Sequence, residues 1–255
     1  MAIAGELLLA ADRNRVSTFR SVLATAPSPG HVHDDEVTLL SSGLPVPLFN
    51  PAFVRRSEDP VALVARVLDH YGVLGLPFLI SFRDEVAPGL ADACDAAGLV
   101  EHWRPALMVL DPIPSTVPPA PSGLHLSRVT AATVDDYAGV LSAGFAMPRE
   151  FADALVGPWL FRGTECAGFI GTIDAEPLGS AALFVSDGVA GVYNIATVPQ
   201  SCRRGVGTAM TWAAIEAGRE AGAGCAILQA SEQGEPVYQR MGFVTPTRYR
   251  QFQST

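Results

Sequence analysis

The sequence predicts a mixed α/β protein with a mostly antiparallel central sheet flanked by helices. Two observations in the C-terminal half lead to this prediction. Three strand-like runs follow one another at 165–173, 178–185 and 190–198, and turn-forming stretches rich in Asp, Gly and Pro separate them. A run at 206–221 then has apolar residues at helical spacing and ends at Gly222.

The other segments of this half complete an order of strand, two helices, three antiparallel strands, helix, strand, helix and strand. Thr133 is a plausible N-cap for the first of these helices, because a hydroxyl before two acidic residues suits a helix start. Besides the runs already given, we expect strands at 124–129 and 225–229, helices at 131–143, 149–156 and 235–241, and a final pair of strands or a hairpin at 243–252.

The N-terminal half repeats this order faintly, which suggests an internal duplication with little residue identity. A proline-rich stretch without periodicity, 111–123, separates the halves and predicts an extended connector. The expected domains are a degenerate copy or accessory domain at 1–110, this linker, and a catalytic domain at 124–255. In the first half we expect helices at 5–26, 61–71 and 86–97, and strands at 36–41, 46–54, 78–82 and 103–110.

Composition and charge narrow the class of protein. The net charge of −9 argues against nucleic acid as the main partner. No apolar run is long enough for a membrane helix and no signal peptide is expected, so we expect a cytoplasmic protein. Four scattered cysteines form no CxxC pair, and we interpret His31 and His33 as part of a solvated loop rather than metal ligands, so no metal is expected.

The most informative stretch is 191–210, where a strand ends and Arg203-Arg-Gly-Val-Gly-Thr208 opens a long helix. The first amides of a helix have no intrahelical partner, and the helix dipole adds positive charge there. Gly205 and Gly207 lack the Cβ atoms that would keep a phosphate from those amides. The stretch therefore predicts a site for a diphosphate.

Two common phosphate loops do not fit this stretch. A P-loop requires a lysine, and the chain contains none. A dinucleotide fingerprint requires a third glycine three residues after Gly207, where the chain has Met210. The diphosphate must therefore belong to another class of ligand.

The stretch 191–243 resembles the GNAT superfamily, the Gcn5-related N-acetyltransferases. The strand end Ile195-Ala-Thr-Val-Pro199 and the loop Cys202-Arg-Arg-Gly-Val-Gly207 fall at the spacing of that family, and so does Tyr238, four residues before a Gly-Phe pair. The resemblance is plausible back to about 124 and weak over 1–120, which at most resembles a degenerate second copy without the phosphate loop.

This resemblance implies an acyl-CoA site with acetyl-CoA, or another short acyl-CoA, as co-substrate. The strand would bulge and diverge from its neighbour, and the Ile195 amide would polarise the thioester carbonyl. Tyr238 would protonate the departing thiolate as general acid. Ser231 would bond pantetheine or a catalytic water, or cap the helix that follows. The residues expected to bind the cofactor are Ile195, Ala196, Thr197, Arg203, Arg204, Gly205, Val206, Gly207, Thr208 and Ser231.

Two departures from the family pattern affect the mechanism. Cys202 stands where the family usually has Gln or Arg, so we expect weaker binding of CoA. The strand 191–198 carries no carboxylate, and the general base is therefore unassigned. The candidates to replace it through water are Asp187, Glu165, Tyr193 and the C-terminal carboxylate of Thr255. Trp159 and Phe161 are candidates for an acceptor pocket or for the core.

The resemblance implies an N-acetyltransferase that uses direct attack by a primary amine. The expected partner is a small-molecule amine or a peptide N-terminus, with no nucleic acid, no membrane and a possible homodimer. The alternatives are a catalytically inactive acyl-CoA-binding or sensing protein, and a tandem acyltransferase of the mycothiol synthase type. The sequence does not identify the acceptor.

Overall fold

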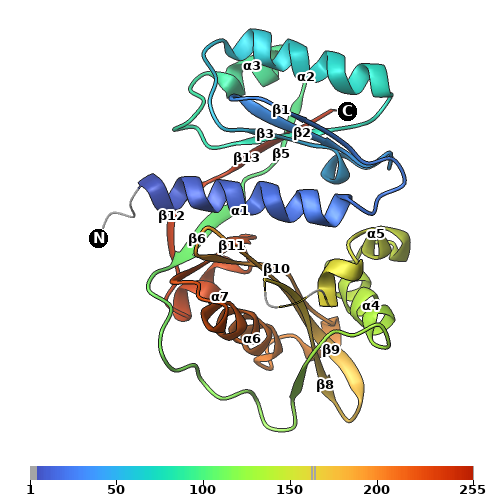
Figure 1. Ribbon diagram of the computed structural model, residues 1–255, viewed down its shortest axis with the longest axis vertical. Helices are drawn as coiled ribbons and strands as arrows, with labels where there is room; N and C mark the ends of the chain where they lie inside the picture. The colour runs from blue at the N-terminus through green and yellow to red at the C-terminus, as the bar shows by residue number, and fades with distance from the viewer. Residues whose placement is uncertain (1–4, 162, 164, 255) are drawn as a thin grey trace. The chain divides into compact units, whose positions relative to one another are not determined.

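A computed structural model describes residues 5–161, 163 and 165–254 of the chain (Figure 1). The predicted mixed α/β class is confirmed: two mixed sheets are flanked by helices. The chain forms two compact units, one made of residues 1–18 and 108–246, and the other of residues 19–107 and 247–255. These units are interleaved along the chain and do not follow the halves 1–110 and 124–255.

The first unit, called the C-terminal unit below, contains a seven-stranded sheet in the order β12-β6-β11-β10-β9-β8-β7. Its helices include residues 5–18 of α1 (Gly5–Leu23). The strands are β6 (Ala106–Leu110), β7 (His125–Arg128), β8 (Cys166–Ile173), β9 (Glu176–Ser186), β10 (Val189–Thr197), β11 (Cys225–Ala230) and β12 (Val244–Arg248), and the other helices are α4 (Val134–Phe145), α5 (Arg149–Ala154), α6 (Val206–Glu220) and α7 (Glu235–Arg240).

Helices α4 and α6 pack on opposite faces of β10, and glycines allow both to come close. A Cβ atom added at Gly218 of α6 would lie 2.5 Å from the Cβ of Ala190, and one added at Gly144 of α4 would lie 2.8 Å from the Cβ of Ala196. Because side chains alternate along a strand, Ala190 and Tyr193 face opposite sides before the irregularity at 194–195. The linker, green in Figure 1, runs without helix or strand from β6 to β7.

The second unit, called the N-terminal unit below, contains a six-stranded sheet in the order β1-β2-β3-β4-β13-β5. Apolar residues at helical spacing on α2, among them Leu63, Val67 and Tyr71, are buried in its core. Its strands are β1 (Gly30–His33), β2 (Val37–Ser41), β3 (Pro51–Val54), β4 (Leu79–Phe82), β5 (Val100–Trp103) and β13 (Arg250–Gln253), and its helices are α2 (Pro60–Leu74) and α3 (Leu90–Ala96).

The two sheets repeat one topology. In each, a strand pairs with its antiparallel predecessor, continues into a helix, and pairs in parallel with the strand after that helix: β9-β10-α6-β11 in one unit and β2-β3-α2-β4 in the other. The next position is filled by a strand from elsewhere in the chain, β6 beside β11 and β13 beside β4. Each half of the sequence thus supplies one strand to the sheet of the other half.

The N-terminal copy has neither feature expected of a CoA site. The Asp59 side chain accepts a hydrogen bond from the Ala62 amide at the start of α2, so this helix start already holds a carboxylate. Strands β3 and β4 stay paired over Pro51–Phe53 without a break in register. This agrees with the expectation of a second copy that lacks the phosphate loop.

Several details of the predicted secondary structure differ from the structure. His31 and His33 lie on an exposed edge strand, β1, rather than in a loop. Of the two alternatives expected at 243–252, the pair of strands is confirmed and the hairpin is not, because β12 and β13 belong to different sheets. Residues 47–49 of the expected strand 46–54 form a 3-10 turn, which Pro47 favours. Thr133 is the N-cap residue of α4 as predicted, but its hydroxyl accepts from the Thr130 amide and makes no capping hydrogen bond to the helix.

Candidate active site

The irregularity in β10 is a β-bulge. Tyr193 lies opposite Ala182 and Ala196 opposite Ser180, so two residues of β10 oppose one of β9. Asn194, within the bulge, has a φ of 52°, and its carbonyl accepts a hydrogen bond of 2.9 Å from the Ser180 hydroxyl. The bulge expected at this strand end is therefore present, and a buried hydroxyl holds it in place.

The strand β10 also diverges from β11, as expected. Their parallel pairing covers Val189 to Gly191 opposite Cys225 to Ile227 and ends there. Beyond this point, the edge of β10 that carries Ile195, Ala196 and Thr197 has no ladder partner in β11. Ladder positions left free in this way are able to accept hydrogen bonds from an extended, amide-containing ligand.

The start of α6 lies close to the end of this open edge. A Cβ atom added at Gly207 would be 3.2 Å from the Thr197 hydroxyl oxygen, so the glycine allows the helix to approach the strand. The first backbone bond of the helix is donated by Ala209 to Gly205, which leaves the amides of Val206, Gly207 and Thr208 ahead of it.

The loop before α6 has the backbone geometry of an anion site. Gly205 is the N-cap with a φ of 82° and provides no side chain to cap the helix. Arg203 also has a positive φ, 62°, and alternation of this kind turns successive amides toward one side. The side chains of Arg203 and Arg204 are exposed and add positive charge. The Cys202 thiol lies 3.7 Å from the Val198 carbonyl oxygen.

Tyr238 lies half-buried on α7, with its ring edge-to-face against Phe243 at 6.0 Å between centroids. Burial raises the pKa of Tyr238 to about 12, and hydrogen bonding with the Thr211 hydroxyl offsets part of this rise. Thr211 in turn donates 2.8 Å to the carbonyl of Gly207. The phenol is thus linked to the first turns of α6 and keeps its proton at neutral pH.

Ser231 is exposed in the turn between β11 and α7, and its hydroxyl oxygen accepts 3.2 Å from the Gly234 amide. This bond closes the turn before α7, whose N-cap is Gly234 without a side-chain cap, so Ser231 does not cap the helix. Gln229, at the end of β11, was not expected to have a role. Its Nε2 atom is buried and has no hydrogen-bond partner among the described residues. A single polar residue in the apolar run Cys225–Ala230 was the available signal in the sequence.

The carboxylates considered as bases lie far from the bulge. Asp187 forms an ion pair of 2.8 Å with Arg13 in the turn before β10, eight residues and roughly 25 Å of extended strand away from Ile195. The Glu165 carbonyl accepts from Val185 at the same end of the sheet. These two candidates are therefore wrong. Thr255 lies outside the described residues.

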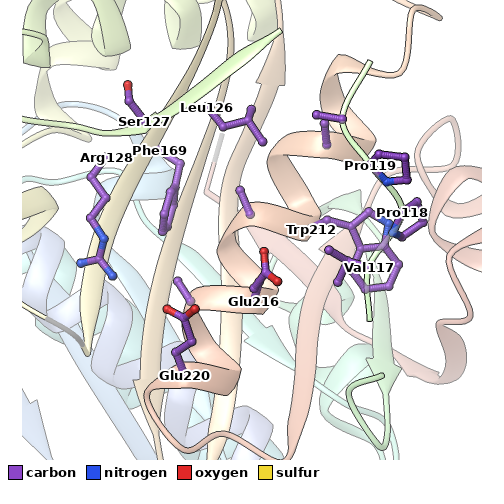
Figure 2. Close-up of a pocket in the computed structure, with 14 residues that line it drawn as sticks. Val117, Pro118, Pro119, Leu126, Ser127, Arg128, Phe169, Trp212, Glu216 and Glu220 are labelled. Carbon is purple, nitrogen blue, oxygen red and sulfur yellow. The ribbon is translucent and has the colours of Figure 1, made fainter. Parts of the chain in front are cut away.

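Two aromatic residues considered for an acceptor pocket have different environments. Trp159 is buried and packs on Phe184 at 4.8 Å between ring centroids, whereas Phe161 is exposed. A groove of about 430 Å³ lies elsewhere, between α6, the linker and β7 and β8. Trp212, the linker prolines and Glu216 line it (Figure 2), and none of the expected site residues does.

The part of the chain that holds these features matches a known family. Residues 136–243 match the model of the acetyltransferase (GNAT) family. They are a GNAT domain. Members of this family use acyl-CoA and act on amines in general. A comparison with functionally curated proteins gives no match.

Solved structures show that the similarity in fold extends over most of the chain. The GCN5-related N-acetyltransferase from Kribbella flavida is 19% identical, with 94% of this chain and 95% of that chain covered and a TM-score of 0.74. That from Sphaerobacter thermophilus is 12% identical, with 86% and 80% covered and a TM-score of 0.62. A tandem GNAT protein from the clavulanic acid biosynthesis pathway is 15% identical, with 92% and 87% covered and a TM-score of 0.57.

The chain thus has the GNAT fold. A tandem GNAT protein is among its structural relatives. Within the described residues, no group of three or more His, Cys, Asp or Glu is arranged to hold a metal ion. No helix in the described ranges has both the length and the apolar character needed to cross a membrane.

Proposed function

We propose that this protein is an N-acetyltransferase that moves an acetyl, or another short acyl group, from acyl-CoA to a primary amine by direct attack. One observation carries the proposal: the uncapped start of α6 lies beside the open edge of β10. The helix start suits a diphosphate, and the strand edge suits an extended chain of amides. CoA contains these two groups in the same order. The acceptor is a small-molecule amine or a peptide N-terminus.

The residues that would hold CoA follow from this order. The amides between Arg203 and Thr208 bind the diphosphate, and the two arginines add charge-assisted contacts. The backbone of Ile195, Ala196 and Thr197 pairs with the pantetheine amides. The Ser231 hydroxyl, which accepts from Gly234, retains its own hydrogen to donate to pantetheine.

Two groups would act on the reacting atoms. The Ile195 amide polarises the thioester carbonyl and stabilises negative charge on its oxygen. Tyr238, which is protonated at neutral pH, gives its proton to the departing thiolate. Proximity between a bound amine and the thioester supplies much of the remaining rate enhancement.

Calorimetric titration of the dialysed protein with acetyl-CoA, followed by thiol release with a panel of primary amines, tests this proposal. We expect saturable binding and turnover, and a loss of about a hundredfold in kcat in Tyr238→Phe with little change in the Kd for acetyl-CoA. If acetyl-CoA does not bind, the proposal is wrong.

A second candidate, a catalytically inactive acyl-CoA-binding protein, is favoured by the absence of a carboxylate along β10 and by the remote position of Asp187. The same experiment separates the two functions. Tight binding of acetyl-CoA without thiol release by any amine supports the binding protein, whereas turnover that depends on Tyr238 supports the enzyme.

A further inference from the structure

The groove of about 430 Å³ beside α6 is separate from the proposed acyl-CoA site. It lies between that helix, the linker segment 117–120 and the strands β7 and β8. On the helix, Ala209, Ala213, Glu216 and Glu220 follow one another at intervals of three or four residues, so they form one stripe along the groove. At 1.5 Å per residue this stripe is roughly 16 Å long. The groove is thus large enough for a small molecule.

One end of the groove is apolar. Trp212 of α6 lies there beside Val117, Pro118 and Pro119 of the linker (Figure 2). Trp212 is only 6% exposed, so packing holds its ring in place and this wall exists before any ligand binds. An aromatic or branched aliphatic group would bury apolar area against it.

Arg128 of β7 lies toward the other end (Figure 2). Its Nη1 atom donates a hydrogen bond of 3.1 Å to the Gly163 carbonyl, and its Cζ atom lies 5.8 Å from the centroid of the Phe169 ring. These two contacts orient the guanidinium. The bond to Gly163 engages one of its five N–H groups, and a planar guanidinium binds a carboxylate through two others.

Two carboxylates lie on the α6 side of the groove. Glu216 forms an ion pair of 3.7 Å with Arg219 on the same helix. The carboxylate of Glu220 has neither an ion pair nor a hydrogen bond with any residue that the structure describes. Glu220 is therefore available for a charge-assisted bond with an ammonium group.

The charges of both signs identify the class of ligand. An amine without a carboxylate would place its positive charge near Arg128, and a carboxylate without an amine would place its negative charge near Glu220. An α-amino acid carries both groups on one carbon, whereas an internal residue of a peptide carries neither. We infer that this groove binds a free α-amino acid with a large apolar side chain: Arg128 binds its carboxylate, Glu220 its ammonium, and Trp212 packs on its side chain.

Calorimetric titration of the full chain with four probes tests the class of ligand. We expect L-phenylalanine to bind with a Kd of about 0.1–1 mM. Each of the other probes lacks one of its groups: 2-phenylethylamine the carboxylate, 3-phenylpropanoate the ammonium, and glycine the side chain. Each should bind at least about tenfold more weakly.

Three variants test the location of the site. Arg128→Gln should weaken L-phenylalanine about tenfold without weakening 2-phenylethylamine, which has no carboxylate to lose. Glu220→Gln should weaken L-phenylalanine about tenfold without weakening 3-phenylpropanoate. Both residues are exposed, so the fold should tolerate these changes. Ala213→Leu, at a half-exposed position, fills the groove and should weaken L-phenylalanine more than about tenfold.

Glu6→Gln is the matched control, because it removes one exposed carboxylate from α1, outside the groove. It should bind L-phenylalanine like wild type. The inference is overturned if L-phenylalanine does not bind at about 10 mM, or if either single-charge probe binds equally well. Equal affinity in all three groove variants would also overturn it, because the amino acid would then bind elsewhere.

The inference goes beyond the proposed function and does not depend on it. The amino acid is titrated without acetyl-CoA, so a protein that fails to bind acetyl-CoA overturns the proposed function alone. Binding of L-phenylalanine as an acceptor at the proposed active site is also distinguishable. It would be unaffected by Arg128→Gln, Glu220→Gln and Ala213→Leu, which lie outside that site.

Discussion

Replacing Gly205 with alanine perturbs the proposed diphosphate site at one atom. Gly205 has a φ of 82°, and the new Cβ would lie 3.1 Å from Cγ of Pro121 in the linker. It would also stand at the mouth of the loop where a phosphate must approach the amides. We therefore expect two separable effects, a loss of folding stability and a loss of affinity for acetyl-CoA.

The sizes of these effects follow from the geometry. A left-handed backbone costs an alanine about 1–2 kcal/mol. Loss of one charge-assisted bond between an amide and a phosphate costs about 1.5–3 kcal/mol, which weakens Kd roughly ten- to a hundredfold. Calorimetric titration with acetyl-CoA measures the affinity, and urea denaturation measures the free energy of unfolding.

A matched control lies at the other end of the same helix. Gly222 has a φ of 91°, and a Cβ added there would meet nothing within 4 Å. Gly222→Ala should therefore lose a similar amount of stability and keep the wild-type Kd. If both variants lose affinity equally, or if Gly205→Ala binds acetyl-CoA like wild type, the loop does not hold the diphosphate and the reasoning is refuted.

Three further predictions concern other parts of the molecule. In Gly144→Ala the new Cβ would lie 2.8 Å from that of Ala196, so the variant should lose about 1–3 kcal/mol of unfolding free energy in urea denaturation and bind acetyl-CoA more weakly. A Cβ at Gly139 on the same helix meets nothing within 4 Å, so Gly139→Ala should show neither loss. Equal effects in the two variants would contradict this. The kcat of wild-type enzyme should not fall between pH 8 and pH 10 through loss of the Tyr238 proton, because its pKa is raised to about 12; a falling limb that Tyr238→Phe abolishes would show otherwise. Hydrogen bonds from Arg250 lower the pKa of Glu101 from 4.5 to about 2. The stability that this ionised carboxylate contributes is therefore complete above about pH 4.5 and is lost as the pH falls toward 2. Because the ion pair is partly screened by solvent, we expect it to contribute about 1 kcal/mol. Urea denaturation between pH 3 and pH 6 should show a smaller dependence of the free energy of unfolding on pH in Glu101→Gln, and an identical dependence would refute this.

The sequence predicts elements well where the deciding forces are local. The strands β8, β9 and β10 and the helix α6 lie within about two residues of their predicted bounds. Their connections use residues suited to tight turns: Asp187 and Gly188, both with positive φ, join β9 to β10. The anion loop is also local, since glycine spacing at a helix start determines it.

Features that depend on partners distant in the chain could not be predicted in this way. The alternation that predicts a strand at β6 or β13 does not tell which sheet the strand joins, and each lies in the sheet of the other half. Asn14 sits in an ordinary helical run, and nothing in its neighbours indicates that its amide meets Tyr193, 179 residues later. Such contacts result from tertiary packing, which periodicity does not encode.

The duplicated topology explains why one unit is expected to bind CoA and the other is not. Both units place a helix start after the second strand of the repeat, and every helix start has amides to satisfy. In α2 the Asp59 carboxylate satisfies one of them, and that negative charge would repel a phosphate. In α6 the N-cap is Gly205, which leaves the amides for a ligand. An aspartate at the N-cap of α2 and a glycine at the N-cap of α6 therefore decide which copy retains an anion site. Gly205→Asp should remove the anion site of α6, as Asp59 does in α2.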